Sequence, residues 1–135
     1  MAYQSFENLD VWQASCRLTV DVYKLLDGSR EFGLKDQMQR AAVSIPSNIA
    51  EGAERGSNRD FARFVRIAKG SAAELRTQLY IADRVGMIST EDREKLAEQL
   101  KVISAQLQRL AEALLKTNSI SEVDEWYPLD LKPKT

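Results

Sequence analysis

Apolar side chains return every three or four residues in four successive segments of the chain, which is the period of one face of an α-helix. The expected helices cover residues 8–27, 34–54, 58–85 and 90–117. No segment shows the strict apolar–polar alternation of a β-strand. The connections are short, and short connections make neighbouring helices antiparallel. The pattern therefore predicts an all-α fold, an antiparallel up-down-up-down four-helix bundle over residues 1–117, followed by an acidic tail over residues 118–135.

Polar residues at the expected helix starts support these boundaries. Ser57 precedes Asp60 by three residues, and Ser89 stands in the same relation to Asp92, so both serines are expected to cap a helix N-terminus. Gly86 is expected to end the third helix.

The second helix contains the chain's strongest helix breakers. Gly33 is expected to interrupt the chain before this helix begins near Leu34. Gly52 and Gly56 bracket its end, and either is suited to a left-handed C-terminal residue. Pro46 lies inside its apolar pattern. Because proline lacks an N–H and clashes with the preceding turn, a kink or an interruption is predicted near residues 42–47.

The first helix carries two adjacent apolar stripes, although one stripe is enough to fill the core of a bundle. One stripe is assigned to the core: Leu9, Trp12, Cys16, Tyr23 and Leu26. The other, called here the surplus stripe, would then face water: Val11, Leu18, Val22 and Leu25. Large exposed apolar strips usually mark interaction surfaces. The surplus stripe is therefore predicted to join copies of the chain, and a glutamate at position 22 is expected to break the assembly but keep the helices.

Several kinds of chemistry are excluded by residue types that are missing. The chain has no histidine and a single cysteine, Cys16, which excludes a disulfide framework and a cysteine zinc site. Di-iron bundles need Glu-x-x-His pairs, serine nucleophiles need an activating base, and the glycine spacing of a phosphate loop is absent. We therefore expect no enzyme activity, no cofactor and no metal. Without an apolar run of ~20 residues or a signal peptide, a cytoplasmic location without membrane contact is expected.

The charge is nearly balanced overall but uneven along the chain. The net charge is −1 at pH 7. Residues 30–76 hold nine basic and six acidic side chains, and five of the basic ones follow each other at the start of the third helix: Arg55, Arg59, Arg63, Arg66 and Lys69. In this basic strip, positions 59, 63 and 66 share one helix face. Guanidinium groups suit phosphate, so the strip is a candidate nucleic-acid contact; the alternative is a solvated face.

A group of polar residues around Pro46 and along the third helix forms a second candidate, called here the polar seam. Its members are Ser44, Asn48, Glu51, Ser71, Glu74 and Thr77. Small polar side chains near a proline can bond the carbonyls that the proline leaves unpaired. Glu51 and Glu74 are predicted to be partly buried and hydrogen-bonded within the seam, because a lone buried carboxylate is costly. The seam is interpreted as a network joining the two helices; the alternative is a ligand or partner site.

Three segments resemble the small proteins encoded in intervening sequences of bacterial 23S ribosomal RNA genes, also labelled S23. They are FENLDVWQA at 6–14, GLKDQMQRAAVSIPSNIAEG at 33–52 and FARFVRIAKGSAAELRTQL at 61–79. The resemblance covers about residues 6–116. It implies an antiparallel four-helix bundle that assembles as a ring, a homopentamer, and it does not imply an enzyme. The bundle also resembles accessory proteins of diversity-generating retroelements, which are basic pentamers that contact a reverse transcriptase and nucleic acid; this chain departs from their basic character.

Two functions follow from these observations. The favoured one is a non-catalytic oligomeric interaction protein whose partner is RNA or a ribonucleoprotein. The alternative is a protein-only scaffold or a small-molecule-binding bundle without a role in nucleic-acid binding.

Overall fold

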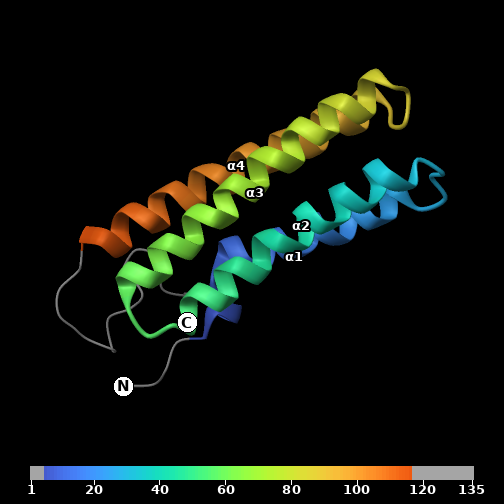
Figure 1. Cartoon of the computed structure of the whole chain (residues 1–135). Helices are drawn as coiled ribbons and strands as arrows, with labels where there is room; N and C mark the ends of the chain where they lie inside the picture. The colour runs from blue at the N-terminus through green and yellow to red at the C-terminus, as the bar shows by residue number, and fades with distance from the viewer. Residues whose placement is uncertain (1–4, 117–135) are drawn as a thin grey trace.

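The protein is an antiparallel bundle of four long helices. The computed structural model describes residues 5–116. A 3-10 helix, η1 (Phe6–Asn8), leads into α1 (Asp10–Leu26), α2 (Phe32–Ala53), α3 (Asn58–Arg84) and α4 (Thr90–Lys116). Figure 1 shows α1 beside α2 and α3 beside α4, with the α1–α2 and α3–α4 turns at the same end. Residues 5–116 contain no strand, and the prediction of an all-α four-helix bundle is confirmed. The predicted acidic tail lies outside the described residues.

The core runs along the centre of the bundle, and each of the four helices contributes one apolar stripe to it. Among the side chains shielded from solvent are Met38 and Ile45 of α2, Leu75 of α3, and Leu100 and Leu107 of α4. α3 packs along both α2 and α4, whereas α1 packs chiefly against α2 and less against α4. Burying each large aliphatic side chain is worth roughly 1.5–3 kcal/mol, so this core is the main source of stability.

The assignment of the two stripes of α1 was wrong. Val11, Leu18 and Val22 are buried in the core, and Leu25 packs against it half-buried. Among the residues assigned to the core, Leu9 and Leu26 are buried, but Trp12 and Cys16 are only half-buried and Tyr23 is exposed. The predicted oligomer interface is therefore part of the monomer's own core.

A buried serine explains the wrong assignment. Ser15 lies between Val11 and Leu18 at helical spacing and interrupts their stripe with a polar side chain. Its side chain is nonetheless fully buried, and its hydroxyl donates a 2.7 Å hydrogen bond to the Val11 carbonyl one turn earlier. Because the hydroxyl is paired within its own helix, it enters the core at little cost.

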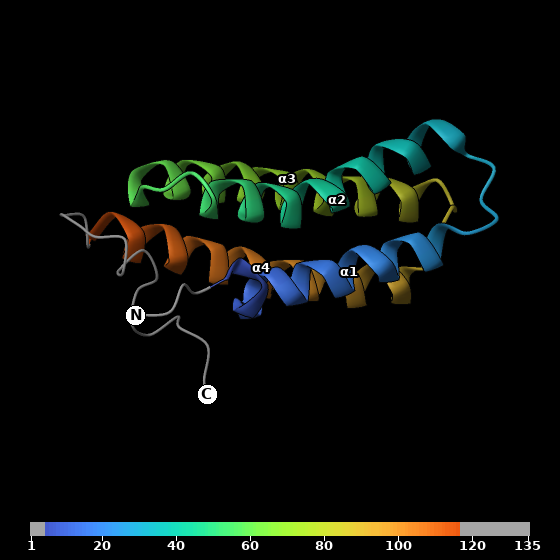
Figure 2. The ribbon, with the colours of Figure 1, turned by 90° about the horizontal axis from the view of Figure 1, so that it is seen from below.

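α2 continues without interruption through Pro46. The helix begins at Phe32, so Gly33 lies in its first turn instead of preceding it, and that prediction was wrong. Of the two outcomes predicted at Pro46, a kink or an interruption, the helix is not interrupted, but it bends: Figure 2 shows the first turns of α2 inclined away from the line of its later turns. The carbonyl that would have bonded a residue-46 N–H is that of Ala42. It accepts a 3.0 Å hydrogen bond from Thr19 Oγ1 of α1, so a neighbouring helix satisfies it.

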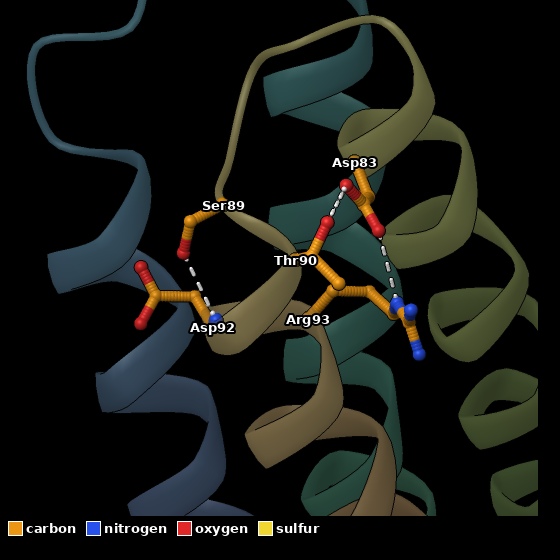
Figure 3. Close-up of polar contacts among 5 residues, drawn as sticks. All are labelled: Asp83, Ser89, Thr90, Asp92 and Arg93. Carbon is orange, nitrogen blue, oxygen red and sulfur yellow. Dashed lines mark hydrogen bonds and ion pairs between the residues drawn. The ribbon is translucent and has the colours of Figure 1, made fainter.

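The expected helix caps are confirmed. Ser57 Oγ accepts the backbone N–H of Asp60 at 3.1 Å. Ser89 Oγ accepts that of Asp92 at 3.0 Å, as Figure 3 shows. Gly86 follows the end of α3 with a φ of 80°. These local devices fix where α3 and α4 begin and where α3 ends.

A polar cluster ties the end of α3 to the start of α4 (Figure 3). Asp83 Oδ1 accepts a 2.8 Å hydrogen bond from Thr90 Oγ1, and Asp83 Oδ2 pairs with Arg93 Nε at 3.1 Å. The Arg93 guanidinium also lies over the Tyr80 ring, 4.5 Å from its centroid. The side chains of Asp83 and Arg93 are 16% and 17% exposed, so this ion pair is better shielded from water than an ordinary surface pair.

The charge of Asp83 should make stability depend on pH. The hydrogen bond from Thr90, followed by Arg93, lowers the pKa of Asp83 below its ordinary value of 3.8. A pKa that is lower in the folded state stabilises the fold above the unfolded value, and the stabilisation is lost as the pH falls through the folded pKa. We expect Asp83→Asn to lower the melting temperature at pH 7 and the difference from wild type to shrink below pH 3.8.

The matched control is Asp36→Asn. Asp36 pairs with Arg40 at 2.9 Å, but the two side chains are 62% and 78% exposed, so the loss should be small at every pH. Thermal unfolding followed by circular dichroism measures both variants. Equal effects of the two substitutions would contradict the special role of the Asp83 cluster.

Candidate functional site

A shallow groove of about 680 Å³ lies between the first turns of α3 and the last turn of α4. Because α3 and α4 are antiparallel, the end of α4 returns to the start of α3, at the end of the bundle opposite the Asp83 cluster (Figure 1). The residues that line the groove include Ser57, Arg59, Arg63, Arg66, Ile67 and Leu115. Asp60 lines it as well. The groove, called here the Arg groove, therefore combines three guanidinium groups and one carboxylate with aliphatic surface.

The members of the basic strip have different surroundings. Arg55 and Arg63 both approach Asp60, with Nε–Oδ distances of 3.6 and 3.5 Å. Their guanidinium groups lie over the Phe64 ring, 5.2 and 4.6 Å from its centroid. Lys69 Nζ donates a 2.7 Å hydrogen bond to Gln108 Oε1 of α4 and does not line the groove. These three cations are thus held by neighbouring side chains.

Arg59 and Arg66 differ from the other members of the strip. Both side chains are exposed, and no ion pair or hydrogen bond joins either of them to another residue within 5–116. Their helical spacing places them on the same side of α3 as Arg63. They are the two cations of the groove whose hydrogen-bond donors are available to a ligand.

The groove offers no aromatic ring for stacking. Phe61 and Phe64 are 1% and 8% exposed, and the second is covered by two guanidinium groups. The apolar surface of the groove comes instead from Ile67 and Leu115, which are 43% and 40% exposed. The lining favours an anionic ligand with an apolar part and does not favour rings inserted between aromatic side chains.

The polar seam forms in part. Asn48 Nδ2 donates to the Ser44 carbonyl at 2.8 Å and to Ser44 Oγ at 2.9 Å, and Ser44 Oγ lies 2.8 Å from Ser71 Oγ. This chain of hydrogen bonds joins α2 to α3, and the side chains that form it are half-buried. Thr77 does not take part in it; its hydroxyl is exposed and donates to the Ala73 carbonyl of its own helix at 3.0 Å.

The prediction that Glu51 and Glu74 are partly buried and hydrogen-bonded within the seam was wrong. Both side chains are exposed. A glutamate at the edge of a helix–helix contact has three rotatable bonds with which to reach water, so its carboxylate avoids the desolvation that burial would cost. Sequence spacing placed these residues beside the seam but does not set the direction of so long a side chain.

Sequence reasoning missed a second groove, on the outer side of α1. It measures about 690 Å³ and is lined by Thr19, Val20, Tyr23, Lys24 and Asp27. Val20 and Tyr23 are 51% and 45% exposed. The available signal was that Val20 belongs to neither stripe of the helix, which marks an apolar side chain without a place in the core.

Other chemistry finds little support within residues 5–116. No group of three side chains there is arranged to ligate a metal. Burial raises the pKa of the Cys16 thiol, which keeps it protonated and unreactive at neutral pH. None of the helices that the structure describes is long and apolar enough to cross a bilayer.

Comparison with known proteins gives the chain's family. The model of the 23S rRNA-intervening sequence protein family matches residues 7–109. The chain belongs to this family. The match confirms the resemblance read from the three sequence segments, and it includes the basic strip and the polar seam in full. The retroelement accessory proteins stay an untested comparison.

A solved structure of the S23 family supports the same conclusion. It is the crystal structure of a protein of unknown function from the S23 ribosomal protein family of Bacteroides thetaiotaomicron. That chain is 27% identical, the similarity covers 76% of this chain and 98% of that one, and the TM-score is 0.71. None of the curated proteins matches this chain.

Proposed function

We propose that this member of the 23S rRNA-intervening sequence family is a non-catalytic, cytoplasmic interaction protein that binds RNA or a ribonucleoprotein through the Arg groove. The proposal rests on Arg59 and Arg66, which are exposed beside Arg63 in one groove. Neither forms an ion pair or a hydrogen bond with another described residue. Arginine binds phosphate through two parallel N–H donors, which makes such a pair suited to a nucleic-acid backbone.

The geometry of the strip supports contact with one strand. From Arg59 to Arg66 the helix advances roughly 10 Å at 1.5 Å per residue, a length over which a nucleic-acid strand presents several phosphates. Because the groove lacks an exposed aromatic ring, we expect contacts to phosphate and sugar to dominate over base stacking, and hence little sequence preference. With a net charge of −1, the protein has no long-range attraction to RNA, so binding depends on these few local contacts.

Self-assembly is the second part of the proposal. The homopentamer comes from the family resemblance. The surplus stripe that was assigned to the contact is buried at Val11, Leu18 and Val22 and half-buried at Leu25. The exposed side of α1, with Val20 and Tyr23, is the surface that now supports a contact between copies. Native mass spectrometry at micromolar concentration should give a multiple of 15.3 kDa. A spectrum that contains only the mass of one chain would reject assembly.

Binding to single-stranded RNA in a salt series tests the role of the groove. The variant Arg59→Gln/Arg66→Gln should bind about tenfold or more weakly at low salt. Its log–log salt slope should be shallower by about 1.4, since each phosphate contact on a single strand contributes about 0.7. Electrophoretic mobility shifts at several salt concentrations measure both quantities.

The matched control removes two arginines that are also exposed but lie at the far end of the bundle. Arg30→Gln/Arg84→Gln changes the net charge by the same amount, and its affinity and slope should stay close to wild type. Equal losses in the two variants would mean that net charge alone acts. Absence of any salt-dependent binding by the wild type would reject the RNA proposal in favour of a protein-only scaffold or a small-molecule-binding bundle.

A further inference from the structure

We propose that the acidic segment 117–131 docks in the Arg groove of its own chain. We further propose that it competes there with RNA; this second statement rests on the proposed function, and the first does not. The proposal combines the place where α4 ends, the charge of the sequence that follows, and the surface of the groove.

The end of α4 places the following chain at the groove. Leu115, in the last turn of α4, is one of the residues that line it, and α4 ends at Lys116. The first acidic residue after the helix is Glu122. The intervening residues span at most about 3.3–3.6 Å each, which is ample to reach Arg59, Arg63 and Arg66 in the neighbouring turns of α3.

The charges are complementary. Residues 117–131 contain four acidic and no basic side chains: Glu122, Asp124, Glu125 and Asp130. The groove presents three arginines and one carboxylate, that of Asp60, which pairs with Arg63 at 3.5 Å. The other two arginines, Arg59 and Arg66, have no ion-pair or hydrogen-bond partner among the described residues. A carboxylate supplies the same pair of acceptor oxygens to a guanidinium group as a phosphate does, so one surface is suited to both.

The apolar parts also match. Ile67 and Leu115 leave aliphatic surface open in the groove. The segment places Trp126 and Tyr127 directly after its acidic residues, and each ring carries a large apolar area with a polar group at its edge. Because the segment is tethered, its effective concentration at the groove is on the order of millimolar. Contacts too weak to hold a separate peptide are then sufficient.

The test follows Trp126 in the full-length chain. The protein has two tryptophans, so Trp12→Phe leaves Trp126 as the single tryptophan, which can be excited selectively in the presence of the four tyrosines. In this background, docking should protect Trp126 from quenching by acrylamide. Arg59→Gln/Arg66→Gln should raise its quenching constant about twofold or more, and Arg30→Gln/Arg84→Gln should leave it unchanged. Neutralising the segment with Glu122→Gln/Asp124→Asn/Glu125→Gln should raise it in the same way as the groove variant.

Two outcomes overturn docking. One is a Trp126 that is quenched equally in all four proteins and as readily as a free tryptophan derivative. The other is protection that disappears on dilution, which would place the segment in the groove of another chain. If Trp12→Phe fails to fold, since Trp12 packs edge-on against Phe6 at 5.3 Å, the signal of Trp126 is obtained instead as the difference between the wild type and Trp126→Phe.

A separate measurement distinguishes docking from competition. Adding single-stranded RNA should raise the quenching of Trp126, and the neutralised segment should bind RNA several-fold more tightly than wild type. Protection of Trp126 together with no binding of RNA would confirm docking and reject the proposed function. Binding of RNA that leaves Trp126 protected would confirm the RNA proposal and overturn the competition.

Discussion

Replacing Val22 by glutamate should unfold the bundle or lower its melting temperature by tens of degrees. The Val22 side chain is 0% exposed and lies in the α1 stripe between Leu18 and Leu26. The substitution removes roughly 1.5–3 kcal/mol of apolar burial and forces a carboxylate into the core, which costs several kcal/mol more. The free energy of unfolding of a native domain is only about 5–15 kcal/mol. Circular dichroism should therefore show a clear loss of helix.

Val20→Glu is the matched control. It places the same side chain on the same helix two residues away, where valine is 51% exposed. We expect its helix content and melting temperature to stay close to wild type. If it dissociates an oligomer and keeps its helices, the contact between copies lies on this side of α1. A folded but dissociated Val22→Glu protein would instead contradict the burial of Val22 and support the interpretation drawn from the sequence.

The features that sequence predicted well depend on interactions within a few residues. Ser57 and Ser89 cap their helices through bonds to backbone groups three residues away, so the local sequence contains both partners. The four helices and their antiparallel order likewise follow from period and connection length. Gly33 shows the limit of this reasoning, because one glycine with no crowding around it is tolerated in a first helical turn.

The features that sequence did not predict depend on partners far along the chain. Thr19 satisfies the Ala42 carbonyl that Pro46 leaves unpaired, and no pattern within α2 points to a donor on α1. The choice between the two stripes of α1 had the same difficulty. It depends on how α1 rotates against α2, and the buried hydroxyl of Ser15 concealed the stripe that faces the core.

The sequence predicted which arginines share a face at the candidate site, but not which of them are held by neighbouring side chains or that a groove lies there. Helical spacing placed Arg59, Arg63 and Arg66 on one face, and the groove contains all three. Which guanidinium groups stay available depends on Asp60 and on the Phe64 ring, which hold Arg63 and also Arg55. The groove itself exists because the last turn of α4 returns beside α3, and this requires the tertiary structure.

Gly52→Ala should destabilise the fold although alanine favours helix. A Cβ at position 52 would lie 2.6 Å from Phe64 Cβ and 3.2 Å from both Phe61 Cδ1 and the Phe61 carbonyl oxygen. The missing side chain is thus what lets the last turn of α2 lie against the start of α3. Overpacking of this kind costs typically about 1–3 kcal/mol, which exceeds the gain of about 0.5–1 kcal/mol from replacing a helical glycine.

Gly70→Ala is the same substitution in the next helix, and it should change the free energy of unfolding in the opposite direction. Gly70 lies in the middle of α3, exposed, and an added Cβ there meets nothing within 4 Å. It should stabilise the protein by about 0.5–1 kcal/mol, and urea unfolding measures both variants.

Because Phe64 supports the guanidinium groups of Arg55 and Arg63, Gly52→Ala should also weaken ligand binding in the Arg groove, whereas Gly70→Ala should not. Stabilisation by both alanines would contradict the close approach of α2 and α3 on which this end of the bundle depends.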